Sequence, residues 1–398
     1  MSRHAFAAAL LLLIALPANA GFEASLDLRV VSSDGRDSFL DGGFGKLRFD
    51  SQDDGVQLGR LRLAWHGGIG GNWFATVDAS SWHPDDDPVI DLTEAYVEWR
   101  PVPQSAWRSN VKIGAFYAPV SLEHRAPGWT NPYTISSSAL NTWIGEELRT
   151  IGIGYELEHL GTANGGRFDW GVQAAAFGWN DPAGVEIGLR GWAMHDRQTT
   201  LFGTIGTYAF GGREKRVIFS EIDNRAGYHV GGYVRTDNGL ELRALHYDNR
   251  GNPEAYKESI EDYAWDTRFD SLGARYDGPR GTTLIAQWLS GKTAADDDPT
   301  MRWEFDTYFM LAAQQLGKHR FSARYDNFGM HQTVSPYGSL ALEYGHAWTI
   351  GWTWAVAEHV ELATEWLRID SFYNKRKALG ENPDAEENLL QFAIRLSL

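Results

Sequence analysis

One long polar segment, Pro119 to Glu147, carries side chains whose charges could act on a small solute. The candidates, including one residue just beyond it, are Glu123, His124, Arg125, Glu146, Glu147 and Arg149. Fixed charges at a constriction select solutes by attraction and repulsion. We therefore expect these residues to attract or repel charged solutes reversibly. A segment that merely caps an opening is the alternative interpretation.

Motifs for covalent or metal chemistry are missing from the sequence. It contains no G-x-S-x-G motif and, among its 12 His, no pair at the spacing of a metal-binding helix. We expect His124 and His229 to line an interior or to lie at the surface. No catalytic residue, cofactor or metal ligand is predicted, and the chain is not expected to be an enzyme.

A second group of charged residues alternates with apolar residues in short segments. Lys112, for example, lies between Val111 and Ile113. A two-residue period places charges on one face of a β-strand and apolar side chains on the other face. The charged residues that we expect to face the same interior are Arg60, Arg62, Glu94, Glu98, Lys112, Arg275 and Arg324.

The same period predicts which side chains face lipid in two further segments. In the segment 168–176, Val172 is predicted on the lipid side and Gln173 on the interior side. In the segment from Trp303 to Ala313, the aromatic and aliphatic face that begins with Trp303 is predicted to contact lipid. Asp306 is then predicted to face the interior.

The connections between these segments alternate in length. The sequence Thr236-Asp237-Asn238-Gly239 predicts a tight hairpin turn. Long polar loops are expected at Ser32–Gly55, Pro119–Glu147, Arg250–Trp265 and Ser371–Glu387. Short turns on one side and long loops on the other are typical of an outer-membrane β-barrel.

We therefore predict an all-β fold, a transmembrane antiparallel β-barrel with short periplasmic turns and long extracellular loops. Segments of the length that a tilted spanning strand needs number about 18. Leu201 to Phe210 and Val360 to Ser371 change their apolar face, so each is either a bulge or a miscount that reduces the total to 16. A soluble β-sandwich is the alternative, but it would not separate loop lengths by side.

The N-terminus predicts export. Arg3 precedes an apolar run from Ala5 to Leu16, and Ala18-Asn19-Ala20 has the form of a cleavage site. We interpret residues 1–20 as a signal peptide and residues 21–398 as one outer-membrane barrel. The apolar run is too short to span a bilayer as a helix.

The composition agrees with a barrel and excludes one class of partner. Aromatic residues make up 13% of the chain, including 17 Trp, and such rings favour membrane interfaces. The formal net charge of −16 disfavours nucleic acid as a partner. The acidic clusters, for which we expect solvated loop surface or divalent-cation bridges to an anionic leaflet, are Asp53-Asp54, Asp85–Asp87, Glu146-Glu147, Asp296–Asp298 and Glu381–Glu387.

Several motifs between Leu61 and Gly154 resemble the phosphate-selective porin O and P family. The stretch Thr93-Glu94-Ala95-Tyr96-Val97-Glu98-Trp99 looks like a strand of that family, and the stretches 113–119 and 147–152 look like the entry into and exit from its third loop. The resemblance implies a homotrimer of 16-stranded channels. Because the third loop here carries more acid than base, we do not expect the family's phosphate preference to transfer automatically.

Together these observations predict a porin in the cell outer membrane that lets small polar solutes or ions diffuse passively, with anions such as phosphate among the candidates. Expected partners are outer-membrane lipid and lipopolysaccharide, and the barrel-assembly machinery that reads the alternating last strand, Asn388–Leu398. Two alternatives remain open, namely a barrel enzyme acting on lipids and a structural or adhesin barrel without transport.

Overall fold

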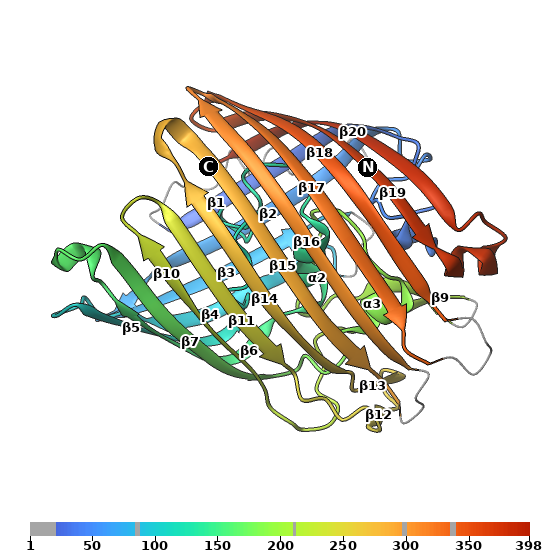
Figure 1. Ribbon diagram of the computed structural model, residues 1–398, viewed down its shortest axis with the longest axis horizontal. Coiled ribbons are helices and arrows are strands. Elements are labelled where there is room, and N and C mark those ends of the chain that lie inside the picture. Colours follow the sequence, from blue (N-terminus) through green and yellow to red (C-terminus); the bar gives the residue numbers. More distant parts are fainter. Residues whose placement is uncertain (1–20, 84–87, 210–211, 297–300, 335–339) are drawn as a thin grey trace.

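The computed structural model describes residues 21–83, 88–209, 212–296, 301–334 and 340–398, and the predicted signal peptide lies outside them. Sixteen antiparallel strands close into a barrel, in which the last strand pairs with the first (Figure 1). The barrel strands are β1 (Phe22–Ser33), β2 (Gly55–Gly70), β3 (Trp73–Ser81), β4 (Asp91–Trp99), β5 (Trp107–Phe116), β6 (Thr150–His159), β7 (Phe168–Gly178), β10 (Gly227–Thr236), β11 (Leu240–Asp248), β14 (Asp266–Asp277), β15 (Thr282–Ala294), β16 (Arg302–Leu316), β17 (His319–Gln332), β18 (Leu342–Ala357), β19 (Val360–Tyr373) and β20 (Asp384–Ser397).

Each barrel strand pairs with its two neighbours, so the backbone hydrogen bonds of the wall have no free edge. The connections are short at one end of the barrel, as at the predicted turn where Gly239 has a φ of 90°. At the other end they are longer and include loop L1 (residues 34–54), loop L3 (117–149) and loop L4 (179–226). The predicted separation of short turns from long loops is confirmed.

The barrel has 16 strands, so the count of 18 was wrong. The doubtful segment Leu201 to Phe210 contains β8 (Ile205–Ala209), which pairs with β9 (Gly212–Arg216) and not with the wall. They belong to loop L4, which is longer than the loop 119–147 that the sequence suggested as the longest. The other segment in doubt, Val360 to Ser371, lies in β19 and is a true wall strand.

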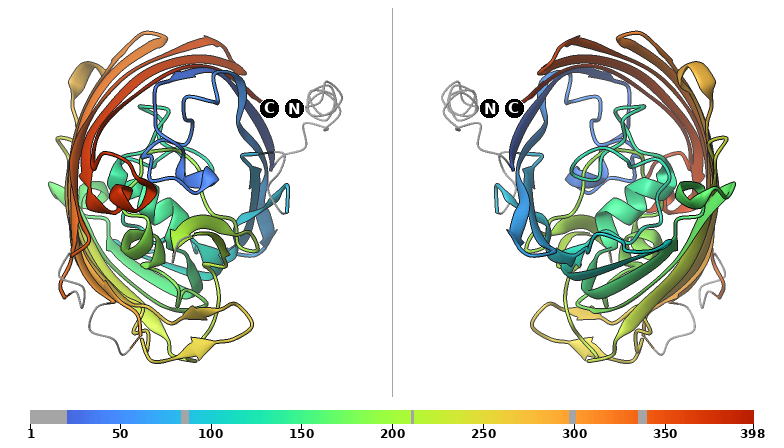
Figure 2. Two further views of the ribbon diagram at one scale, coloured as in Figure 1. Left: turned by 90° about the vertical axis from the view of Figure 1, so that its right-hand side faces the viewer. Right: turned by 90° about the vertical axis from the view of Figure 1, so that its left-hand side faces the viewer.

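The remaining elements are short and lie in loops. They are α2 (Ala139–Glu147), α3 (Val185–Leu189), the paired β12 (Tyr256–Lys257) and β13 (Asp262–Tyr263), and four 3-10 turns, η1 (Phe39–Asp41), η2 (Thr162–Asn164), η3 (Pro279–Gly281) and η4 (Asn374–Leu379). Within the described ranges, no helix has the length and apolar character needed to cross a bilayer. Figure 2, which looks along the barrel, shows both α-helices inside the ring of strands.

The alternation of faces is confirmed where the wall has a polar interior. Val172 is 48% exposed on the outer face of β7, whereas Gln173 is buried. On β17, Phe321 is exposed and Arg324 is buried. The charged and apolar faces of these strands therefore lie as the two-residue period predicted.

The faces of β16 are reversed relative to the prediction. Trp303, Phe305 and Phe309 are buried in the interior, and Asp306 lies on the outer face. The reason is that the interior holds a hydrophobic core, in which these rings pack with Trp143 of α2 and residues of loop L4. An apolar face therefore does not by itself identify the lipid side in a barrel whose loops fill its lumen.

Candidate pore and its constriction

Loop L3 crosses the barrel interior and is held to the opposite wall. The backbone N–H groups of Ile135 and Ser136 donate to the carboxylate of Glu365 on β19, at 2.6 and 2.9 Å. Glu123 accepts from Arg324 of β17 at 2.7 Å, and both side chains are fully buried. Because these anchors lie on β17 and β19, across the barrel from β5 and β6, loop L3 lies inside the barrel rather than over its mouth.

The charge of Glu123 is stabilised where it lies. Burial opposes ionisation, but the charge of Arg324 and the hydrogen bonds from Ser138 and Asn141 hold the pKa of Glu123 below its ordinary value. Asn131 and Asn141 also donate to its carboxylate at 2.6 and 2.7 Å. Burial lowers the pKa of His124 to about 4, so its ring is neutral at pH 7. Glu123 is thus an anchor of loop L3.

The end of α2 packs against loop L4 through carboxylates. Arg190 donates to both oxygens of Glu146, at 2.9 and 2.6 Å, and His195 lies 3.0 Å from the same group. Burial alone would raise the pKa of Glu146, but Arg190 and His195 lower it to about 2. Burial raises the pKa of Glu147 to about 7, although its carboxylate accepts from Trp143 and from two backbone N–H groups.

The packing of α2 against loop L4 contradicts the predicted exposure of one acidic cluster. The pair Glu146-Glu147 was expected on solvated loop surface, but both side chains are fully buried. They are buried because loop L4 supplies Arg190 and the amide groups at the start of α3 as partners. The clusters Asp85–Asp87 and Asp296–Asp298 lie wholly or mostly outside the described residues.

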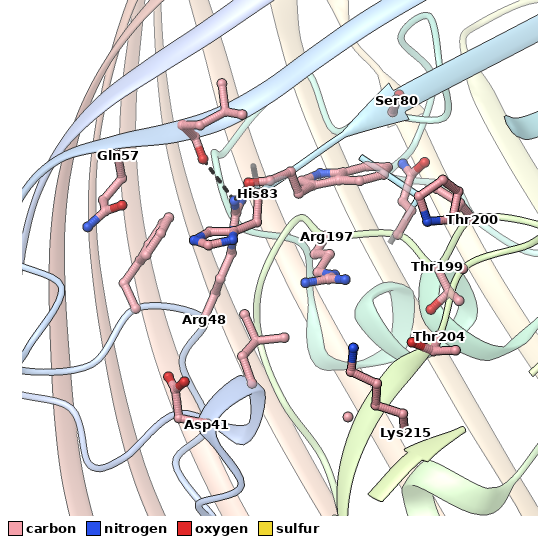
Figure 3. Close-up of a pocket in the computed structure, with 18 of the residues that line it drawn as sticks. Asp41, Arg48, Gln57, Ser80, His83, Arg197, Thr199, Thr200, Thr204 and Lys215 are labelled. Atoms are coloured by element: carbon pink, nitrogen blue, oxygen red, sulfur yellow. Dashed lines mark hydrogen bonds between the residues drawn. The ribbon is translucent and has the colours of Figure 1, made fainter. Parts of the chain in front are cut away.

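Two cavities remain in the interior beside the wall formed by β1 to β3. One, of about 330 Å³, lies toward the long loops and is bordered by Arg48, Gln57, Trp82 and Lys215, among others (Figure 3). The second, of about 520 Å³, lies toward the short turns and is bordered by Arg60, Arg62 and His124. Gln198 of loop L4 borders both cavities. The two cavities are the candidate solute path.

The partition between the cavities is a cluster of arginines around one carboxylate. Asp196 of loop L4 accepts from Arg29 of β1 at 3.1 and 2.5 Å and from Arg48 of loop L1 at 3.3 Å. Asp196 borders the 520 Å³ cavity, whereas Arg48 borders the 330 Å³ cavity. We call Arg29, Arg48, Arg60, Asp196 and Gln198 the neck.

Arg60 and Gln198 close the neck against loop L3. Arg60 and Gln198 both donate to the carbonyl oxygen of Gly128, at 3.1 and 3.2 Å. Gly128 has a φ of 66°, and a Cβ there would lie 2.5 Å from the Nε atom of Arg62. A glycine is therefore required for the loop backbone to approach the arginines of β2 this closely.

The predicted site residues separate into three groups. Arg60, Arg62 and His124 border the larger cavity. Glu123, Glu146, Glu147, Arg149 and Arg324 are buried behind the cavity walls and border neither cavity. Arg149, for example, stacks on Tyr117 and donates to the carbonyl oxygen of Thr199 at 2.7 Å. The second group holds the loops that shape the path.

Of the remaining predicted residues, Arg125, Arg275 and Glu94 hold loop L3 to the wall, and Lys112 and Glu98 lie on the wall strands β5 and β4. Arg125 pairs with Glu241 at 3.0 Å, and Arg275 donates to the carbonyl oxygen of Leu122 at 3.1 Å. Glu94 accepts from the backbone N–H of Tyr117 at 3.1 Å. Lys112 borders a separate cavity of about 80 Å³, and Glu98 accepts from Asn110 at 2.6 Å.

Sequence reasoning missed the residues at the centre of the neck. Arg29 could have been found, because Asp27 and Arg29 alternate with the apolar residues of β1. Arg48 and Asp196 lie in loops, where no periodicity indicates which side chains turn toward the lumen.

Comparison with solved structures identifies the fold class. An anion-selective porin from Comamonas acidovorans has a TM-score of 0.53 at 14% identity, and the match covers 95% of this chain and 98% of that chain. OmpT of Vibrio cholerae in its trimer form has a TM-score of 0.53 at 11% identity, covering 96% and 100% of the two chains. OmpF of Salmonella typhi, in complex with daunomycin, has a TM-score of 0.53 at 12% identity, covering 95% and 97%.

These matches define a porin-like barrel of 16 strands. No protein-family model matches the chain, and no curated protein sequence matches it. The resemblance to the phosphate-selective porin O and P family is therefore supported at the level of the porin fold and not at the level of that family.

Proposed function

We propose that this protein is an outer-membrane porin through which small polar solutes and ions diffuse passively. The observation that carries the proposal is the pair of cavities on either side of the neck, inside a closed 16-stranded barrel. Their borders include many charged and hydrogen-bonding side chains, which suits hydrated solutes. The apolar core, which includes residues of each strand from β14 to β19, occupies a large part of the remaining lumen and leaves these cavities on the side of β1 and β2.

The exported location is part of the same proposal. A closed antiparallel barrel satisfies its backbone hydrogen bonds internally and can therefore sit in hydrocarbon. The signal-peptide pattern of residues 1–20 supplies the route to the outer membrane, and lipid, lipopolysaccharide and the assembly machinery are the corresponding partners. The trimer form of the similar OmpT supports a homotrimer.

The solute preference that we propose is weak selection rather than a phosphate-specific site. The predicted acids of loop L3 are buried, so they do not repel anions along the path. At the neck, Arg29, Arg48 and Arg60 are balanced in part by Asp27, Asp78 and Asp196. Anions, phosphate included, are therefore candidate solutes. The alternatives of a lipid-acting enzyme and of a sealed structural barrel draw no comparable support from the interior.

Swelling of proteoliposomes in uncharged sugars of increasing size tests the proposal. We expect monosaccharides to cause swelling and large oligosaccharides to cause none, because loops L1, L3 and L4 narrow the lumen. Protein-free liposomes in the same sugars are the control. Absence of swelling with every sugar would contradict a general channel, and so would equal swelling with every sugar.

A further inference from the structure

The carboxylate of Asp196 binds Arg29 and Arg48 in the way that the carboxylate of a diffusing solute would. Its two oxygens face Nη1 and Nη2 of Arg29 in a fork, at 3.1 and 2.5 Å, and Arg48 adds a third contact at 3.3 Å. The paired geometry of guanidinium and carboxylate is the strongest hydrogen-bonded form of this contact. The arginine side chains are nearly inaccessible, whereas that of Asp196 is 18% exposed. Water and solute can therefore reach the carboxylate.

The wall around this contact has more positive than negative charge. Asp27 of β1 accepts from Arg29 at 2.9 Å and from Arg395 of β20 at 3.1 Å. Without Asp196, the three cations Arg29, Arg48 and Arg395 would face two carboxylates, Asp27 and Glu361, and Glu361 pairs with Arg395 at 3.0 Å. Asp196, from loop L4, supplies the missing negative charge. The carboxylate of a solute could supply the same charge.

The charge state of Asp196 is secure. Burial disfavours its ionised form, but the two arginines outweigh burial and hold its pKa below the ordinary value. The carboxylate is therefore an anion at any pH at which a carboxylic acid solute is ionised.

The contact also lies across the path. Asp196 borders the cavity toward the short turns, and Arg48 borders the cavity toward the long loops. Because Asp196 and Arg48 lie 3.3 Å apart, this pair lies between the two cavities. We propose that Arg29 and Arg48 form a transit site for a small carboxylate, which Asp196 occupies at rest and which the solute takes over by exchange. This inference rests on the proposed channel function.

Exchange explains how an anion could cross a site that contains two buried arginines. Two bare arginines would hold an anion strongly and slow its exit, whereas conduction requires a site that releases what it binds. When a solute carboxylate replaces that of Asp196, Arg29 and Arg48 keep a carboxylate partner, and the displaced carboxylate of Asp196 remains nearby as an additional anion that favours release of the solute. The displaced carboxylate of Asp196 can turn toward the 520 Å³ cavity that it already borders.

A monocarboxylate fits this exchange better than phosphate. It has the same charge and the same planar pair of oxygens as Asp196, so it reproduces the fork on Arg29. Phosphate carries between one and two negative charges near pH 7 and has tetrahedral geometry. A comparison of acetate with inorganic phosphate therefore tests which of the two kinds of oxyanion the site binds.

The experiment is block of the chloride current by acetate in planar bilayers, using the full mature chain and its Asp196→Asn variant. Asparagine keeps the shape of the side chain but no longer competes as an anion. We expect the acetate concentration for half-block to fall about tenfold in Asp196→Asn, because the internal competitor has lost its charge-assisted hydrogen bonds. Glu254→Gln removes one exposed negative charge in the loop 249–265 and is the control. Acetate should block the current through this variant at the same concentration as in the wild type.

A second variant covers the case in which Asp196→Asn does not assemble. Arg48 lies in loop L1, and Arg48→Gln should lower the permeability of acetate relative to chloride at least about twofold, measured as a reversal potential. An unchanged half-block in Asp196→Asn, an equal change in Glu254→Gln, or an unchanged reversal potential in Arg48→Gln would overturn the inference. If the half-block concentration in Asp196→Asn fell further for phosphate than for acetate, the assignment of the solute as a carboxylate would be overturned. In each of these outcomes the wild type still conducts, whereas a wild type without current would overturn the channel itself.

Discussion

Arg324→Met is expected to lower the free energy of unfolding by about 3–5 kcal/mol. Arg324 is fully buried on β17, and it pairs with Glu123 of loop L3 and with Asp326 of its own strand, each at 2.7 Å. It also donates to the carbonyl oxygens of Ser136 and Ser137, both at 2.8 Å. Methionine fills similar space, but it leaves two buried carboxylates without their cation. Urea unfolding in lipid vesicles measures the loss.

Arg100→Met is the matched control, since Arg100 follows β4 in a short connection, where its half-exposed side chain pairs with Glu98 at 3.7 Å. Exposed ion pairs contribute little, so this variant should unfold close to the wild type. Equal urea midpoints for Arg324→Met and the wild type would show that loop L3 is not anchored to β17 as described.

Val172→Arg should cost about 2–4 kcal/mol if the residue lies near the bilayer midplane, and less toward either interface. Val172 is exposed on the outer face of β7, where an arginine would enter hydrocarbon. Gln173→Arg, one residue further, should cost less. Its side chain points inward to a small cavity that Glu156 also borders, and Glu156 is its cross-strand neighbour.

Refolding stability of the two variants in vesicles of one lipid composition compares the faces directly. A greater loss for Gln173→Arg than for Val172→Arg would contradict the register of β7. A slip of one residue would exchange the two positions, so the comparison tests the register of the strand and not merely its presence.

Much of the fold could be predicted from local patterns. Alternation around Arg324 and Gln173 gave the correct inner face, because one side of these strands is polar and the other apolar. The lengths of the connections gave the correct ends of the barrel. The strand number could not be predicted reliably, because Leu201 to Phe210 contains aliphatic and aromatic residues like those of a wall strand, and only the pairing of β8 with β9 excludes it from the wall.

The reversed face of β16 has a different cause. Trp303 and Phe305 face inward because α2 and loop L4 cover them, so that the interior is locally apolar. A two-residue period identifies two faces but does not say which faces lipid when both environments are apolar. Only the placement of Trp143 and its neighbours inside the barrel decides this.

The candidate site was predictable in part for the same reason. The period identified Arg60 and Arg62, which border the larger cavity, and the loop length identified loop L3 as the inward segment. The contact of Asp196 with Arg29 joins residues that are 167 positions apart, and Asp196 follows no strand pattern. Such a contact depends on how loop L4 folds back into the barrel.

Single-channel recording from the purified mature protein in planar bilayers tests the central claim, a water-filled path through the barrel, most directly. The account predicts discrete current steps whose size rises with salt concentration, because ions cross through hydrated cavities. A folded sample, recognised by its changed gel migration on boiling, is required for the comparison. Folded protein that inserts into the bilayer but produces no steps above the protein-free background would contradict the account.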